Sequence, residues 1–214
     1  MKKIFAMAAI AAAIAMPASA QMYVGAGVGS ASSENANGTV NSYNGVAVPG
    51  GPLTWGIDKS TTSWKLLAGM QLTPVWGVEV QYSDLGKKDY SVVQGAAAGV
   101  TGSIDASQYS IAGTGKYMFS PTTYVHAKLG VTGNDLNGKR VCMVANPTAC
   151  YSPGNNTNTG FLWGFGLGHN FNKNWGIKGG YENFGKVMNN LDVNVNQSKS
   201  VTMSNMGVNV IYSF

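Results

Sequence analysis

Hydrophobic side chains alternate with small or polar ones in segments of about ten residues along most of the chain. In the last segment, Met206, Val208 and Val210 lie on one side of an extended chain, and the residues between them are polar or glycine. A period of two is typical of strands with one face toward lipid and the other toward a lumen. Eight strands are predicted, at approximately 22–30, 62–72, 76–86, 105–119, 122–132, 159–171, 175–185 and 201–214.

The connectors between these segments alternate in length. Segments 73–75, 120–121 and 172–174 are short and rich in Pro or Asn, which is typical of tight turns. The other connectors are rich in Gly, Asn and Ser, and they cover about 31–61, 87–104, 133–158 and 186–200. Short periplasmic turns and long extracellular loops are typical of outer-membrane barrels. The pattern therefore predicts an all-β membrane protein, a closed eight-stranded antiparallel up-and-down transmembrane β-barrel with both termini in the periplasm.

The outward positions are apolar, with aromatic residues gathered at the strand ends. Aromatic girdles at both membrane interfaces are typical of such barrels. We expect a lipid-facing girdle that comprises Trp76, Tyr82, Tyr117, Phe119, Trp163, Phe171, Trp175, Tyr212 and Phe214.

The inward positions are mostly small or polar, with a few charges. Small side chains suit an eight-stranded barrel, whose interior is only wide enough for side chains to fill. Counting from the turns places Glu79 and Lys116 at similar depth on neighbouring strands, and buried charges of this kind require partners. We expect a lumenal ion-pair cluster of Lys65, Glu79, Lys116, His126, Lys128, Lys178 and Glu182. It is either a satisfied polar core, the reading we favour, or the gate of a narrow conduit.

Composition agrees with a membrane barrel. The chain has 44% hydrophobic residues, only 11% charged residues and 29 glycines, whereas soluble domains average about 25% charged residues. No long apolar helix follows residue 20. A closed sheet satisfies every backbone hydrogen bond within hydrocarbon, so it is the expected solution for an exported chain of this kind.

The N-terminus has the pattern of a secretory signal. Lys2 and Lys3 precede an apolar run over 4–16 and a Pro-Ala-Ser-Ala stretch at 17–20, which together indicate cleavage before Gln21. We expect a signal peptide at 1–20 and a barrel domain at 21–214. Removal of the two lysines lowers the formal net charge from +5 to +3, and the remaining basic residues are scattered, so no nucleic-acid partner is expected.

Several segments resemble the OmpA-like transmembrane barrels and the shorter opacity-type surface antigens. They are Trp76–Gly86 (WGVEVQYSDLG), Gly115–Phe119 (GKYMF), Ala127–Gly130 (AKLG), Gly164–Gly168 (GFGLG), Gly180–Glu182 (GYE) and the ending Tyr212-Ser213-Phe214. The resemblance implies a lumenal ion-pair cluster that plugs or gates a narrow path, and recognition of Phe214 by the barrel-assembly machinery. Larger family members continue into a peptidoglycan-binding domain, so peptidoglycan tethering is not carried over to this chain.

Cys142 and Cys150 both lie in the third long loop. Export into an oxidising compartment favours a disulfide between them. Closing this ring stabilises the folded state by about 2–3 kcal/mol in the chain-entropy model. We expect the main effect on the order of the loop. A metal or redox role is disfavoured, because no histidine lies at zinc-ligand spacing from either cysteine.

Readings that invoke a cofactor or a catalytic site have weak support. The glycine-rich stretch 24–30 lacks the following helix and acidic residue of a dinucleotide-binding loop. Likewise 113–117 lacks the first glycine and the Ser/Thr of a phosphate-binding loop. The only histidines are His126, expected in the lumen, and His169, near a turn, so no catalytic triad is evident. We expect no enzyme activity, no cofactor and no metal.

The expected function is that of a bacterial outer-membrane anchor whose loops are displayed at the cell surface. Candidate contacts for host, phage or antibody ligands are the segment 43–55 and the loop with the two cysteines. Membrane lipid and lipopolysaccharide are expected neighbours, and we expect a monomer. The main alternative is a narrow porin-like channel for ions or small solutes. A soluble periplasmic binding protein would not need the aromatic girdles or Phe214.

Overall fold

The structure is a computed structural model that describes residues 21–34, 37–40, 42–43, 46–47, 53–57, 60–94, 101–138, 141–143, 146–151, 156–188 and 201–214. The predicted signal peptide at 1–20 and parts of the predicted long loops lie outside these residues. Within the described ranges, no helix has the length and hydropathy needed to cross a membrane.

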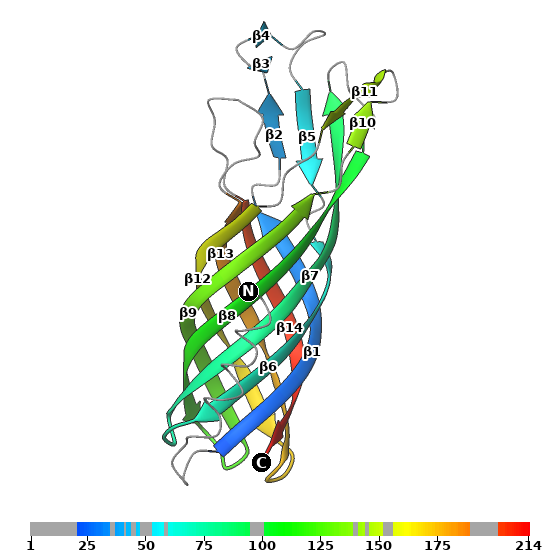
Figure 1. The fold of residues 1–214 in the computed structure, drawn as a ribbon. Coiled ribbons are helices and arrows are strands. Elements are labelled where there is room, and N and C mark those ends of the chain that lie inside the picture. Colours follow the sequence, from blue (N-terminus) through cyan, green and yellow to red (C-terminus); the bar gives the residue numbers. More distant parts are fainter. Residues whose placement is uncertain are drawn as a thin grey trace.

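Eight long strands form the body of the molecule (Figure 1). They are β1 (Gln21–Glu34), β6 (Ser60–Gln71), β7 (Trp76–Gln94), β8 (Thr101–Met118), β9 (Thr123–Gly138), β12 (Asn156–Asn170), β13 (Trp175–Met188) and β14 (Val201–Ser213). Each pairs antiparallel with its neighbours along the chain, and β1 pairs with β14 to close the ring. The predicted closed eight-stranded antiparallel barrel is confirmed.

Short strands extend the molecule beyond one end of the barrel. β5 (Leu53–Ile57) pairs with β7, and β2 (Asn37–Val40) pairs with β5. Two small hairpins accompany them: β3 (Ser42–Tyr43) with β4 (Val46–Ala47), and β10 (Val141–Met143) with β11 (Asn146–Tyr151). The expectation that 31–61 and 133–158 are connectors without strands is wrong for their described parts.

Several long strands also continue further into the predicted loops than expected. β7 runs to Gln94 instead of 86, and β9 runs to Gly138 instead of 132. Beyond a register shift, β7 and β8 remain hydrogen bonded from the pair Lys87↔Asp105 to the pair Ser91↔Thr101. These extensions lie above the apolar part of the barrel, so they need no alternation of apolar residues and the hydrophobic pattern did not reveal them.

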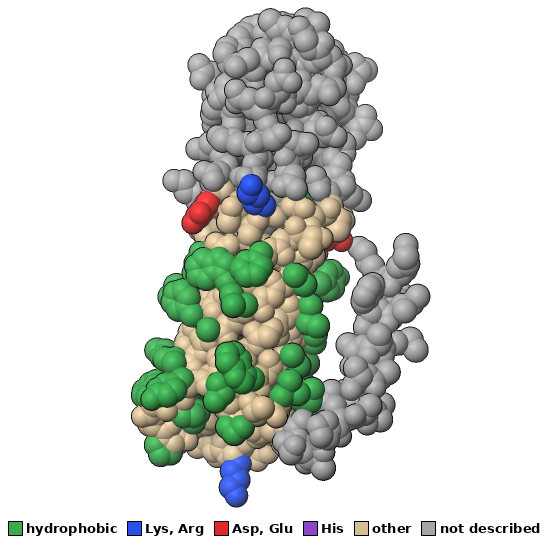
Figure 2. Space-filling model, turned by 90° about the vertical axis from the view of Figure 1, so that its left-hand side faces the viewer, with side chains coloured by type: hydrophobic (Ala, Val, Ile, Leu, Met, Phe, Trp, Pro, Cys, Tyr) green, Lys and Arg blue, Asp and Glu red, His purple; other side chains and the backbone are tan. Residues whose placement is uncertain are grey.

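The outer surface of the barrel is an apolar band. Side chains that point outward, such as Val28, Ile111 and Phe165, are 55–65% exposed, while most of their sequence neighbours are buried or partly buried. Figure 2 shows hydrophobic side chains gathered around the middle of the barrel, with charged side chains beyond both ends of the band. Exposed apolar surface on this scale is stable only against another apolar phase.

The barrel contains an internal repeat that places two similar hairpins opposite each other. Residues 64–87 align without gaps with 163–186, and the two segments share two tryptophans, three glycines, a tyrosine and a lysine at equivalent positions. The four-residue turns match as well: Trp76 N donates to Thr73 Oγ1 at 2.9 Å, and Trp175 N donates to Asn172 Oδ1 at 2.8 Å. In the order of strands around the ring, β7 and β13 are four positions apart in either direction.

The repeat includes a bulge near the long-loop end of both hairpins. Gly86 and Gly185 have positive φ values of 77° and 68°, and each lies within a register shift. The residues before them, Leu85 and Phe184, are fully buried. A bulge with glycine in the left-handed region re-aims the neighbouring side chain. Here it brings two apolar side chains inside the barrel, on opposite walls.

Glycines on the inner wall allow close approach between strands. A Cβ atom on Gly166 would collide with the Gly179 carbonyl oxygen and Gly180 Cα. A Cβ on Gly133, which is at an outward position of β9, would meet nothing within 4 Å. Overpacking costs about 1–3 kcal/mol, so Gly166→Ala should lower the free energy of unfolding by that amount. Gly133→Ala is the matched control, and alanine there should be neutral or stabilising by up to about 1 kcal/mol. Urea unfolding in lipid vesicles measures both; equal effects would contradict the prediction.

Candidate functional site

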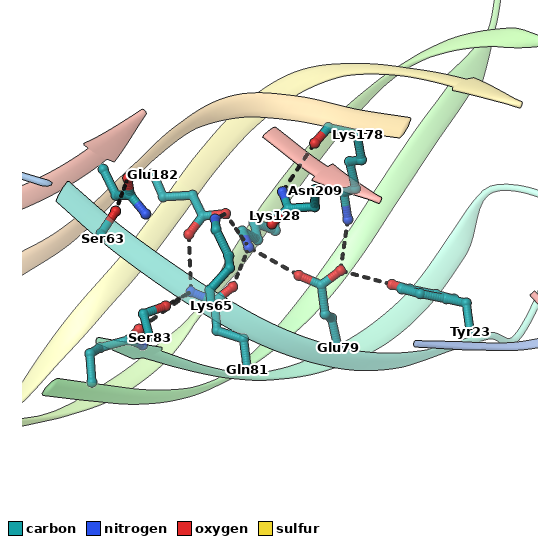
Figure 3. A network of polar contacts seen from close by, with 12 residues as sticks. Tyr23, Ser63, Lys65, Glu79, Gln81, Ser83, Lys128, Lys178, Glu182 and Asn209 are labelled. Carbon is teal, nitrogen blue, oxygen red and sulfur yellow. Dashed lines mark hydrogen bonds and ion pairs between the residues drawn. The ribbon is translucent and has the colours of Figure 1, made fainter. Parts of the chain in front are cut away.

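Five ion-paired side chains meet inside the barrel, and we call them the lumenal cluster (Figure 3). The members are Lys65 on β6, Glu79 on β7, Lys128 on β9, and Lys178 and Glu182 on β13. Each occupies an inward position in the alternation of its strand. The cluster thus joins strands that are distant in sequence and lie on different walls of the barrel.

Glu79 accepts hydrogen bonds from side chains on three other strands. Lys178 Nζ lies 2.7 Å from Oε2, and Lys128 Nζ lies 3.0 Å from Oε1. The Tyr23 hydroxyl on β1 donates to Oε2 at 2.9 Å. One carboxylate therefore ties β7 to β1, β9 and β13 across the lumen.

Glu182 is held in a similar way. Lys65 Nζ and Lys128 Nζ lie 2.6 Å and 2.7 Å from its Oε1 atom. Gln81 Nε2 donates to Glu182 Oε2 at 3.0 Å, and the side-chain oxygen Oε1 of Gln81 accepts from Lys128 Nζ at 2.7 Å. Lys128 is shared by both carboxylates and is the link between the two halves of the cluster.

Burial makes the pairing of these charges necessary. Lys65, Glu79 and Lys128 are each only 2% exposed. A buried charge loses several kcal/mol of hydration, which only close partners and hydrogen bonds offset. The cluster therefore cross-links strands on different walls of the barrel.

Two residues of the predicted cluster lie outside the ion-pair network. Glu79 lies opposite Ala112 in the β7–β8 register, and Lys116 is four residues further toward the short-turn end. The expected similarity in depth between Glu79 and Lys116 was therefore wrong. Lys116 Nζ lies 5.9 Å from the centre of the Tyr124 ring, and His126 is opposite Lys116 in the β8–β9 register.

Tyr23 and Gln81 complete the hydrogen bonding of the carboxylates, and neither was predicted from the sequence. The internal repeat could have predicted one contact of the cluster. Glu79 and Lys178 occupy equivalent positions of the two repeated hairpins, and hairpins opposite each other in a narrow barrel present equivalent inward positions to one another. Opposite charges at such a pair of positions are a signal for contact across the lumen.

The predicted aromatic girdle maps onto the outer surface. Trp76, Tyr117, Phe119, Trp163, Phe171, Trp175 and Phe214 are exposed, and Tyr82 and Tyr212 are partly exposed. Several of them pack against one another: the Trp175 and Tyr212 ring centres are 4.9 Å apart, and those of Tyr212 and Phe214 are 5.2 Å apart. Trp175, Tyr212 and Phe214 therefore form one aromatic group near the short-turn end.

The two cysteines lie opposite each other in the β10–β11 hairpin, where Cys142 pairs with Cys150 in the antiparallel register. Directly opposed residues have Cα atoms about 4.5–5.5 Å apart, within the range that a disulfide spans. We predict that the exported protein resists alkylation before reduction and takes two alkyl groups after it, as measured by mass spectrometry. Two thiols that react without reduction would contradict this. A Cys142→Ser variant, which has one free thiol, calibrates the labelling.

Comparisons with known proteins agree on the kind of molecule. The family model described as outer membrane protein beta-barrel domain matches residues 4–214. No curated protein matches the chain significantly by sequence.

Solved structures share the fold at low sequence identity. The crystal structure of the outer membrane protein OprG from Pseudomonas aeruginosa is 13% identical, with a TM-score of 0.65, and the match covers 91% of this chain and 96% of that one. That of Ail, the attachment invasion locus protein of Yersinia pestis, is also 13% identical, with a TM-score of 0.50 and coverage of 91% and 98%. At such identities the likeness concerns the fold.

Proposed function

Because the chain belongs to the outer membrane protein beta-barrel domain family, we propose that it serves as a structural anchor in the bacterial outer membrane and displays its long loops at the cell surface. The observation that carries the proposal is the asymmetry of the barrel. Tight turns close one end, while β2, β5 and the extended parts of β7 and β8 project from the other. A rigid scaffold with projecting loops is the usual way in which proteins present binding surfaces.

The buried lumenal cluster supports an anchoring role. The lumenal cluster crosses the barrel, and its side chains are almost fully buried. An eight-stranded interior is normally filled in this way. The name of the Yersinia pestis neighbour, an attachment invasion locus protein, is compatible with display of adhesive loops. We extend the same role to this chain, with host, phage or antibody ligands as candidate partners.

Surface labelling tests the orientation on which display depends. An epitope is inserted between residues 97 and 98, in a long connector, and separately between 172 and 173, in a short turn. Antibody should bind intact cells with the first insertion and only permeabilised cells with the second. The opposite result would overturn the proposal. Heat-dependent gel mobility of both products shows that the barrels are folded, and adhesion assays on cells with shortened loops then test the function itself.

The proposal includes export and insertion. Removal of residues 1–20 should leave Gln21 as the first residue of the mature protein, and N-terminal sequencing measures this. We propose that Phe214 is recognised by the barrel-assembly machinery, that lipopolysaccharide and membrane lipid surround the apolar band, and that the barrel is a monomer. We propose no enzymatic step for this chain.

A narrow channel is the second candidate, and the shared position of Lys128 favours it. Because Lys128 contacts both carboxylates, the cluster has alternative pairings through which a path could open. Planar-bilayer recordings of the wild-type protein and of Lys128→Met test this. Discrete conductance that increases in the variant would support a gated channel, and silent membranes with both proteins would remove it.

A further inference from the structure

A polar cavity lies inside the barrel at its short-turn end, next to the lumenal cluster. Its volume is about 90 Å³, which is room for several water molecules and therefore for a small ion. The lining includes Tyr23, Lys116, Tyr124, His126 and Lys178. None of the described residues that line it is acidic.

The charges around this cavity are unbalanced. Lys173 also lines the cavity, but it lies exposed in the turn between β12 and β13. Apart from it, four lysines and two glutamates belong to the cavity and the adjoining cluster, and they leave a surplus of two positive charges: Lys65, Lys116, Lys128, Lys178, Glu79 and Glu182. Every lysine of the lumenal cluster has a carboxylate partner. Lys116 Nζ instead lies over the ring of Tyr124, and the like charge of Lys178 repels it.

Unused hydrogen-bonding atoms surround the same space. His126 Nε2 and Gln71 Nε2 are buried and have no hydrogen-bond partner among the described atoms, and both residues line the cavity. Buried polar atoms are rarely left unsatisfied, and such an atom often marks an unseen water or ion. Gln71 Nε2 and the two lysine ammonium groups are donors, and an imidazole nitrogen is one in the right tautomer.

The internal repeat shows which of these groups are confined to one half of the barrel. In the other half, the position equivalent to Lys116 is Ser213, because Lys116 N and Ser213 N donate to the carbonyl oxygens of Val75 and Asn174, which are equivalent in the two hairpins. His126 lies opposite Lys116 and Tyr23 lies opposite Ser213, so a tyrosine stands at the position equivalent to His126. The hairpin turns are retained in both halves. The positive charge and the imidazole therefore lie on one side of the cavity, and a serine and a tyrosine take their places on the other side.

We propose that this cavity binds a small oxyanion of the phosphate type, held by Lys116 and Lys178 with His126 and Gln71 as further hydrogen-bonding partners. A phosphate group carries nearly two negative charges and several acceptor oxygens, which matches the surplus charge and the number of donors better than chloride does. Charge-assisted hydrogen bonds are the strong ones. The site does not depend on the display role, because it lies at the opposite end of the barrel from the projecting strands.

Calorimetric titration of the refolded barrel in an uncharged detergent tests the site. Inorganic phosphate is one ligand and dihexanoyl phosphatidic acid is the other, with sodium chloride at equal ionic strength as the blank. Saturable binding of free phosphate identifies a soluble anion, and binding of the lipid alone identifies a headgroup. Lys116→Ser installs the residue found in the other half and should weaken binding by about tenfold or more. Lys186→Ser, which removes an exposed lysine near the other end, should bind as the wild type does.

Three outcomes would overturn the proposal: no saturable binding of either ligand, equal binding by Lys116→Ser and the wild type, or equal losses in both variants. Gel mobility before and after heating shows that each variant is folded. A measurement on the wild type covers the case in which Lys116→Ser does not fold. The ¹⁵N resonances of the His126 ring should shift as ligand is added, and unchanged resonances at saturating ligand would also contradict the site.

Discussion

Replacing Glu79 with glutamine is expected to lower the free energy of unfolding by about 3–5 kcal/mol, the cost of removing one partner from a buried ion pair. Glutamine keeps the shape of the side chain but removes its charge. Lys128 retains Glu182 at 2.7 Å, so Lys178 is the residue that loses its carboxylate. A buried ammonium group left without a counter-charge is the main source of the destabilisation.

A second substitution that removes the orphaned ammonium group should restore part of the lost stability. Lys178→Met in the Glu79→Gln background removes the orphaned charge, so the double variant should unfold at a higher urea concentration than Glu79→Gln alone. Glu34→Gln is the control for loss of a carboxylate, because Glu34 is exposed, and it should change stability by less than about 0.5 kcal/mol. If Glu79→Gln and Glu34→Gln unfold alike, the cluster does not stabilise the barrel.

The direction in which each side chain faces could be predicted from the sequence, because it depends only on a period of two. The depth of a side chain within the barrel could not be predicted in this way. Counting from the turns put Glu79 and Lys116 at one level, but strands in a closed barrel are staggered by its shear. The observed register sets Glu79 opposite Ala112 instead. Contacts across the lumen depend on this stagger, which no single strand encodes.

The repeat explains what more could have been predicted. Alignment of Trp76 with Trp175 brings Glu79 onto Lys178 and Tyr82 onto Tyr181, and this needs no structure. By contrast, the contact of Tyr23 with Glu79 joins β1 to β7, which are not adjacent in the sheet. Neither strand pattern nor repeat indicates it. The strands above the apolar band were missed for a further reason: some of their buried positions are polar or charged, such as Lys88 and Ser103, so the hydrophobic period does not continue there.

The second large effect is expected on the outer surface, where Val210→Arg should destabilise the barrel by about 2–4 kcal/mol in a bilayer. Val210 is 52% exposed and lies in the middle of the outward run of β14 between Met206 and Phe214. Its partner on β1 is Ala26, which is flanked by the outward Val24 and Val28. An arginine at this position would place its charge among the apolar side chains of the band.

The cost should depend on depth rather than on the arginine itself. Leu72 is 47% exposed but lies at the β6–β7 turn, so Leu72→Arg should cost no more than about 1 kcal/mol, because the charge reaches the interfacial region there. Unfolding in vesicles measures both variants against the wild type, and Val210→Leu shows the effect of changing the side chain without adding charge. If the apolar band faces water, Val210→Arg becomes harmless and solubility without detergent improves. Equal costs at the two positions would likewise contradict a hydrocarbon layer centred on Val210.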